Sequence, residues 1–174
     1  LKPCLAHLWH KYRTEHRLTG MGKVIEARTR SQLIETYARV SASGIEFMVQ
    51  QKIGGGEDQL WALLTYFNRG SEPLALFTKR KLRQYPREFG DSCYQIGMWD
   101  AEVAELGLRL LRGMAYRGNA GVEFKRDPQD GQLKLVEINP RSLATNFNAV
   151  VSGVDLPFVA YADSAGDSVD KAMT

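Results

Sequence analysis

The chain has 174 residues, of which 44% are hydrophobic and 25% are charged, and its formal net charge is +3. This composition predicts one globular domain or two small subdomains; it excludes a disordered tail, and no apolar run approaches the roughly 20 residues of a membrane span. The two cysteines make no disulfide framework, and a reducing cytoplasm is therefore the expected compartment.

Short elements are predicted in the first third of the chain. Apolar spacing marks four segments, namely 2–16 (helical spacing), 23–27 (strand), 31–40 (helix) and 45–51 (strand). The predicted inward face of the 31–40 helix consists of Leu33, Ile34, Tyr37 and Val40. A triple glycine at 54–56 follows the last of these segments.

The rest of the chain predicts paired strands with helices between them. The segments are 60–68 (strand), 74–79 (strand), 99–114 (helix), 120–126 (strand), 133–139 (strand) and 142–152 (helix). An acidic tail follows, for which no element is predicted. This order indicates an α+β fold or a mixed α/β sheet, and it differs from a doubly wound βαβ protein.

The most informative stretch runs from residue 121 to 141. Alternate side chains of a strand share a face, so Glu137 and Asn139 project together. If the hairpin loop is 128–132, Glu123 lies directly opposite Glu137 and the apolar faces of the two strands coincide.

These residue types suit a metal ion. A buried pair of carboxylates must share a proton or hold a cation, and oxygen ligands favour Mg²⁺ over zinc or copper. An isolated Glu-x-Asn is more simply a solvated strand end. The matching Glu123, and Arg141 after Asn139, favour the metal site over that interpretation.

Three weaker signals accompany the hairpin. Lys2 and Lys23 stand beside short apolar strands and suit phosphate, with Gly20 and Gly22 offering backbone N–H groups nearby. Each lysine alone is more typical of a surface residue. The glycine-rich turn 54–56 is either a hinge that reads an adenine edge or a plain linker.

The third weak signal is a basic run at 78–87, which contains Lys79, Arg80, Lys81, Arg83 and Arg87. Such a run is usually a solvated face, and nucleic-acid binding is the alternative. Because it contains a single tyrosine and no interleaved aromatic platform, contact with an anionic substrate or a triphosphate fits better. A zinc site from Cys4, His7, His10 and His16 does not fit zinc spacing.

Taken in order, these residues resemble an ATP-grasp protein of the carboxylate–amine ligase type. Gly-Val-Glu-Phe at 121–124 and Val-Glu-Ile-Asn-Pro-Arg at 136–141 resemble the magnesium strands of that family, and 47–57 resembles its adenine-binding hinge. The resemblance implies an α+β ATP-grasp fold. Two small α/β subdomains, 1–50 (lid) and 51–174 (metal-binding hairpin), would grip a nucleotide between mixed or antiparallel sheets.

The resemblance also implies residue roles. Lys2 and Lys23 would hold phosphates, Gln50, Gln51 and Ile53 the adenine, Glu57 the ribose, Glu123, Glu137 and Asn139 the Mg²⁺ (or Mn²⁺), and Arg141 and Lys81 the transferred phosphate and the acyl phosphate. The family often has Glu where Gln50 stands. A domain that precedes the first lysine strand in known members is absent from this sequence, and we expect it to complete the substrate pocket.

The implied reaction joins a small-molecule carboxylate to an amine through an acyl phosphate made from ATP. No membrane or nucleic-acid partner is expected. Two alternatives stay open at this point: a non-catalytic nucleotide-binding module, and a basic nucleic-acid-binding domain that uses residues 79–87.

Overall fold

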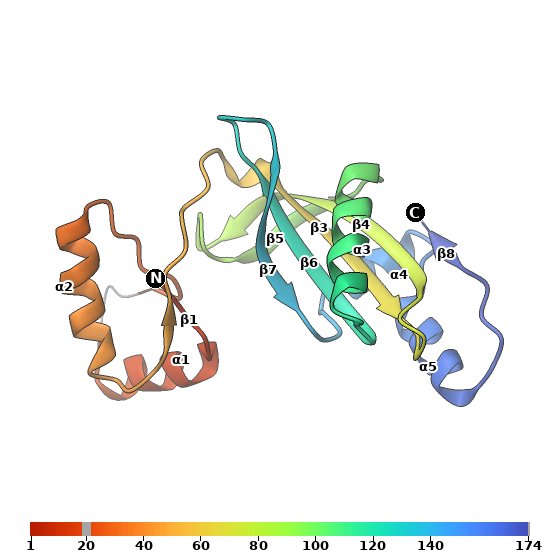
Figure 1. Ribbon diagram of the computed structural model, residues 1–174, viewed down its shortest axis with the longest axis horizontal. Helices are drawn as coiled ribbons and strands as arrows, with labels where there is room; N and C mark the ends of the chain where they lie inside the picture. Colours follow the sequence, from red (N-terminus) through yellow and green to blue (C-terminus); the bar gives the residue numbers. More distant parts are fainter. Residues whose placement is uncertain (19–21, 174) are drawn as a thin grey trace. The chain divides into compact units, whose positions relative to one another are not determined.

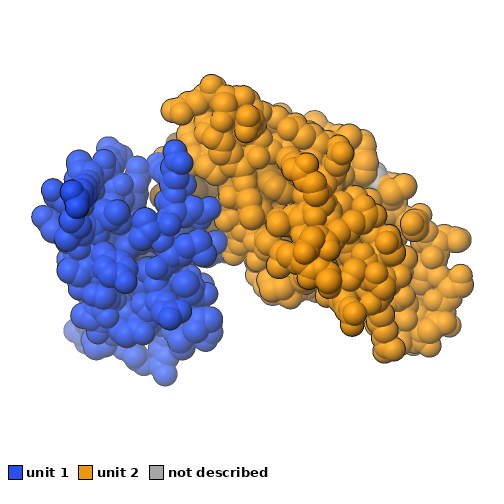
Figure 2. Space-filling view, in the orientation of Figure 1, with its two compact units in different colours: residues 1–52 blue, residues 53–174 orange. Residues whose placement is uncertain are grey.

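The computed structural model describes residues 1–18 and 22–173 of the chain. The chain divides into two compact units, Leu1–Lys52 and Ile53–Thr174, which are coloured separately in Figure 2. Each unit has its own hydrophobic core. No described helix has the length and apolar character that crossing a bilayer requires.

The first unit packs two helices against a short strand pair. Its elements are β1 (Lys2–Pro3), α1 (Ala6–Glu15), α2 (Arg30–Ser41) and β2 (Phe47–Met48), with β1 antiparallel to β2 (Figure 1). Trp9 is 1% exposed and meets the Phe47 ring edge-on at 5.0 Å. Its indole N–H donates to the Gly22 carbonyl at 3.1 Å, so the polar group of this buried side chain is hydrogen-bonded.

Three expectations for the first unit were wrong. Residues 23–27 form no strand: Ile25 exchanges two hydrogen bonds with Leu1, and no ladder continues from them. The strand expected at 45–51 is only two residues long. Ile34 and Tyr37 are exposed, because the core contacts α2 only along Leu33 and Val40. Gly20 lies outside the described residues.

The second unit is built on one mixed sheet. Its elements are η1 (Glu57–Gln59), β3 (Leu60–Phe67), β4 (Pro73–Tyr85), β5 (Asp91–Gly97), α3 (Ala101–Gly113), β6 (Gly118–Arg126), β7 (Leu133–Asn139), α4 (Asn146–Val151), α5 (Leu156–Ala165) and β8 (Ala172–Met173). The strand order is β5-β4-β3-β6-β7, all antiparallel, and β8 joins β4 in parallel. The predicted α+β class and both predicted strand pairs are confirmed.

Helices cover both faces of this sheet (Figure 1). On one face Leu63 and Val122 pack with Val103 and Leu111 of α3. On the other, Leu64 and the neighbouring strand residues pack with α4 and α5. All residues of β3 are buried, as a central strand between two helical layers requires.

The tail contains an element that was not expected. It forms α5, where Asp155 caps the helix by accepting from the Phe158 N–H at 3.0 Å. Gly166 ends the helix in the left-handed region, at φ 90°. Strand β5 was also missed, because its sequence is polar and most of it is at least partly exposed.

Gly107 allows α3 to approach β3 closely. A Cβ at this position would lie 2.6 Å from Cδ2 of the fully buried Leu63. We expect Gly107→Ala to lower the free energy of unfolding by about 1 kcal/mol, because overpacking outweighs the helix-propensity gain. Gly113→Ala is the matched control: no atom lies within 4 Å of its Cβ, so urea titration should show a small gain. A gain for both variants would contradict the prediction.

Candidate functional site

Charged side chains of β4, β6 and β7 gather on one face of the sheet, in a row that crosses β3 at an alanine. Ala62 of the central strand pairs with Lys79 of β4 on one side and with Glu123 of β6 on the other. Glu123 in turn pairs with Glu137 of β7. Residues paired across strands share a face, so Lys79, Ala62, Glu123 and Glu137 form one row. The small side chain of Ala62 leaves room above it for the longer neighbours.

The hairpin has the predicted pairing at its glutamates. Near the turn it is one residue off, because Arg126 pairs with Leu133, and a register shift between Glu123 and Phe124 restores the predicted pairing. Glu123 lies opposite Glu137, and Asn139, two residues on, lies opposite Gly121. The three oxygen-bearing side chains therefore project from one face, and each is partly buried. This donor set of two carboxylates and an amide fits Mg²⁺. Among residues 1–18 and 22–173, no group of three His, Cys, Asp or Glu side chains offers a metal site.

Lys81 forms an ion pair with Glu123. Its ammonium donates to Glu123 Oε2 at 2.6 Å, and the two side chains are 8% and 18% exposed. The ammonium thus neutralises Glu123, and a bound metal ion would have to share this carboxylate with it. The ammonium also offsets the repulsion between the two facing glutamates.

Lys79 is a buried cation with neutral hydrogen-bond partners. It is 2% exposed, and its ammonium donates to Gln95 Oε1 at 2.8 Å and to Thr145 Oγ1 at 2.7 Å. The pKa of Lys79 is lowered from its ordinary 10.5 to about 8. Burial is the largest cause, the Lys81 charge acts in the same direction, and Glu123 acts against both.

The basic run does not form one surface. Lys79 and Lys81 lie buried on the sheet face that packs with α4 and α5, whereas Arg80 points to the opposite face. There Arg80 stacks over Trp61 at 5.4 Å and donates to the Asp58 carbonyl at 2.6 Å. Strand alternation therefore divides the run, which weakens the nucleic-acid interpretation.

Glu57, expected to contact ribose, holds a turn of the sheet. Its carboxylate accepts from the backbone N–H of Gln84 at 3.1 Å and of Glu88 at 2.9 Å. These two donors lower the pKa of Glu57. The Ile53 carbonyl nearby accepts from Lys125 at 3.1 Å, so the start of this unit is fastened to β6.

The remaining predicted residues lie in less regular segments. Gln50 and Gln51 are exposed and follow β2 outside any strand, and Lys23 is exposed in a bend. Lys2 is half-buried on β1. Arg141 is exposed just beyond β7, where its backbone N–H donates to the Asn139 carbonyl at 2.9 Å. The structure gathers Lys81, Glu123, Glu137 and Asn139 on one sheet face.

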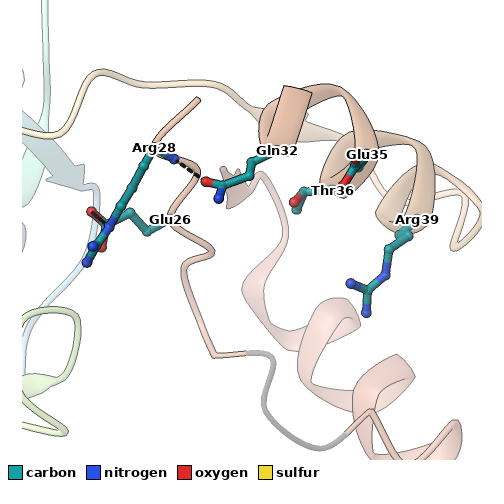
Figure 3. Close-up of a pocket in the computed structure, with 6 residues that line it drawn as sticks. All are labelled: Glu26, Arg28, Gln32, Glu35, Thr36 and Arg39. Atoms are coloured by element: carbon teal, nitrogen blue, oxygen red, sulfur yellow. Dashed lines mark hydrogen bonds and ion pairs between the residues drawn. The ribbon is translucent and has the colours of Figure 1, made fainter. Parts of the chain in front are cut away.

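The first unit has a polar hollow of about 490 Å³ (Figure 3). It is lined by Glu26, Arg28, Gln32, Glu35, Thr36 and Arg39. Glu26 is paired with Lys52 at 3.1 Å and with Arg28 at 3.5 Å, and the Arg28 N–H donates to Gln32 at 2.9 Å. These charges satisfy one another, and none of the predicted site residues lines the hollow.

Comparison with known proteins shows what the chain resembles. No family profile matches it. A curated D-aspartate ligase from Enterococcus faecium (strain Aus0004) is 25% identical over 141 residues, which are 79% of this chain and 34% of that protein. The chain therefore spans about a third of the length of this relative.

Solved structures share the architecture. N5-carboxyaminoimidazole synthetase from Staphylococcus aureus, complexed with ADP, matches with a TM-score of 0.60 at 13% identity, over 84% of this chain and 39% of that one. The biotin carboxylase domain of Hydrogenobacter thermophilus 2-oxoglutarate carboxylase, in complex with MgADP, gives 0.58 at 14% identity, over 84% and 34%. The chain has the ATP-grasp fold.

The ATP-grasp resemblance read from the sequence is thereby confirmed. What sequence reasoning missed within this fold is the trio of Lys79, Gln95 and Thr145. A signal for Lys79 was present: it alternates with Arg80 and shares a strand face with Lys81. Gln95 and Thr145 carried no signal, because only the folded sheet brings them to Lys79.

Proposed function

We propose that this chain is the nucleotide- and metal-binding part of an ATP-dependent ligase that forms a C–N bond between a carboxylate and an amine. Support comes from the ATP-grasp fold and from the similarity to a D-aspartate ligase. The single observation that carries the proposal is the facing pair Glu123 and Glu137, with Asn139 on the same face. The relatives are longer, and we propose that a further domain of the same cytoplasmic protein completes the acceptor site.

In the proposed reaction, a carboxylate oxygen of the acid substrate attacks the γ-phosphorus of ATP, which gives an acyl phosphate and ADP. The amine then attacks the acyl carbon, and inorganic phosphate leaves as the amide forms. When held by Glu123, Glu137 and Asn139, Mg²⁺ (or Mn²⁺) would neutralise negative charge on the phosphates. The chain itself supplies alignment and fixed charge, and needs no nucleophilic side chain.

Each predicted residue has a place in this proposal. Glu123, Glu137 and Asn139 hold the metal, and Lys81 and Arg141 stabilise charge on the transferred phosphoryl group. Lys2, Lys23, Gln50 and Gln51 of the first unit, and Ile53 and Glu57 of the second, contact the phosphates, the adenine and the ribose. For Glu57 to reach a ribose, its bonds to the Gln84 and Glu88 N–H groups must be exchanged for bonds to hydroxyls.

Calorimetric titration with ADP and Mg²⁺ tests the proposal. We expect micromolar to millimolar binding that depends on Mg²⁺, together with a higher melting temperature in its presence. The titration is repeated with AMP, which lacks the β-phosphate and should bind more weakly. Absence of heat and of a thermal shift at millimolar Mg-ADP would rule the proposal out. D-aspartate is the first amine to include in an activity screen.

A further inference from the structure

Lys79 orients two neighbouring side chains. An ammonium group has three hydrogens and no acceptor, so it bonds only to the acceptor end of a partner. The Lys79 ammonium donates to Oε1 of Gln95 at 2.8 Å and to Oγ1 of Thr145 at 2.7 Å. The amide NH₂ of Gln95 and the hydroxyl hydrogen of Thr145 are therefore directed away from Lys79. Both residues are partly exposed, so these donors are accessible to a ligand.

Thr145 accepts from Lys79 and does not cap helix α4. It occupies the N-cap position of α4, where a threonine oxygen ordinarily accepts from a helix N–H group, but no such cap bond forms. One turn further along α4, the Asn148 Nδ2 atom is a buried donor with no hydrogen-bond partner among the described residues. Lys79 thus brings the Gln95 amide and the Thr145 hydroxyl together, and Asn148 lies one turn further along α4.

The charge nearest to Gln95 and Thr145 is positive, although Lys79 and Lys81 are balanced by Glu123 and Glu137 over the face as a whole. Lys81 is compensated by Glu123 at 2.6 Å, whereas both hydrogen-bond partners of Lys79 are neutral. A buried cation without a charged hydrogen-bond partner leaves a positive potential at the groups that cover it. Directed donors backed by a positive charge are the chemistry that binds an oxyanion.

We infer that Gln95 and Thr145 bind the carboxylate group of the acid substrate, and that Lys79 is the positioning residue behind them. The inference rests on the proposed function, because it names the site for the acid that the ligase activates. The inferred carboxylate site is formed by β4, β5 and the start of α4, and it lies beside the proposed metal-binding pair on β6 and β7.

Gln95→Glu is the decisive variant. The change conserves shape, but it pairs a carboxylate with Lys79 and turns an outward oxygen, an acceptor, toward the ligand. Acetate binding, followed by broadening of its methyl NMR signal, should weaken at least tenfold while the melting temperature stays equal or rises. Gln129→Glu, in the exposed loop between β6 and β7, adds the same charge elsewhere and should bind acetate like the wild type. Equal acetate affinity in the two variants would overturn the inference.

Two further variants keep the test open if one fails to fold. Thr145→Val removes a hydroxyl without changing size, and Lys79→Met removes the charge behind both donors; each should weaken acetate binding several-fold. Inorganic phosphate is titrated in parallel, and if only phosphate binding responds, the assignment to a carboxylate is wrong. Mg-ADP affinity is measured on the same samples. If the wild type does not bind Mg-ADP, the proposed function is refuted. If it binds Mg-ADP but the variants bind acetate as tightly as the wild type does, this inference alone is refuted.

Discussion

Replacing Glu137 by Gln is expected to lower the affinity for Mg-ADP about hundredfold. Glu137 lies between the other two proposed ligands: across the hairpin from Glu123 and on the same strand face as Asn139. The amide keeps the shape but removes one charge next to a divalent cation, which is worth about 3 kcal/mol or more at such distances. Calorimetry with Mg-ADP measures the loss.

The fold should tolerate this change. Two glutamates that face each other across a strand pair repel, so the protein without nucleotide should melt at the same temperature or slightly higher. Glu105→Gln on the exposed side of α3 is the control, because it removes one negative charge far from the hairpin in sequence. If Glu137→Gln binds Mg-ADP as tightly as Glu105→Gln does, the metal assignment is wrong.

The hairpin that carries these residues was predictable because local rules agree there. Strand alternation set the faces of Glu123 and Glu137, but their direct pairing depends on a register shift between Glu123 and Phe124, which the loop length alone does not predict. Helix α3 was predictable for the same reason: its apolar positions recur with helical spacing after the Asp100 cap.

Elements that depend on tertiary contacts were harder to predict. Strand β5 is polar, and it is recognisable only as the neighbour of the long β4. Helix α5 had local signals, an Asp155 cap and Gly166 at its end, but its apolar residues are not confined to one stripe. The ends of the first unit's strands likewise depend on pairing between segments far apart in the sequence. The spacing of apolar residues along one segment does not predict such pairing.

The burial of Lys79 could not be predicted from composition, because a lysine within a basic run is normally solvated. The fold covers it with Gln95 from β5 and Thr145 from the segment before α4, contributed by positions 16 and 66 residues away. The energetic consequence of that burial is open to direct measurement.

The free energy of unfolding is expected to rise with pH because of Lys79. Its pKa is lowered from 10.5 to about 8 in the folded protein, first by burial and then by the Lys81 charge. Below pH 8 the lysine is charged in both states, and the full cost of burying the charge is present. Between pH 8 and 10.5 the unfolded chain binds the proton more tightly, so stability increases with pH. From pH 7 to 9.5 the gain is about 2 kcal/mol.

Urea titrations across this pH range, on the wild type and Lys79→Met, isolate the effect, because the contributions of other groups cancel in the difference. The wild-type slope should exceed that of Lys79→Met. Lys134→Met is the contrasting control. Asp130 and Asp127 raise the pKa of Lys134, so the stability that this lysine contributes is lost only above the pH at which an ordinary lysine loses its proton. That variant should lose stability equally at pH 7 and 9.5. If wild type and Lys79→Met share one pH slope, Lys79 is not desolvated in the folded protein, and water screens its charge at Gln95 and Thr145.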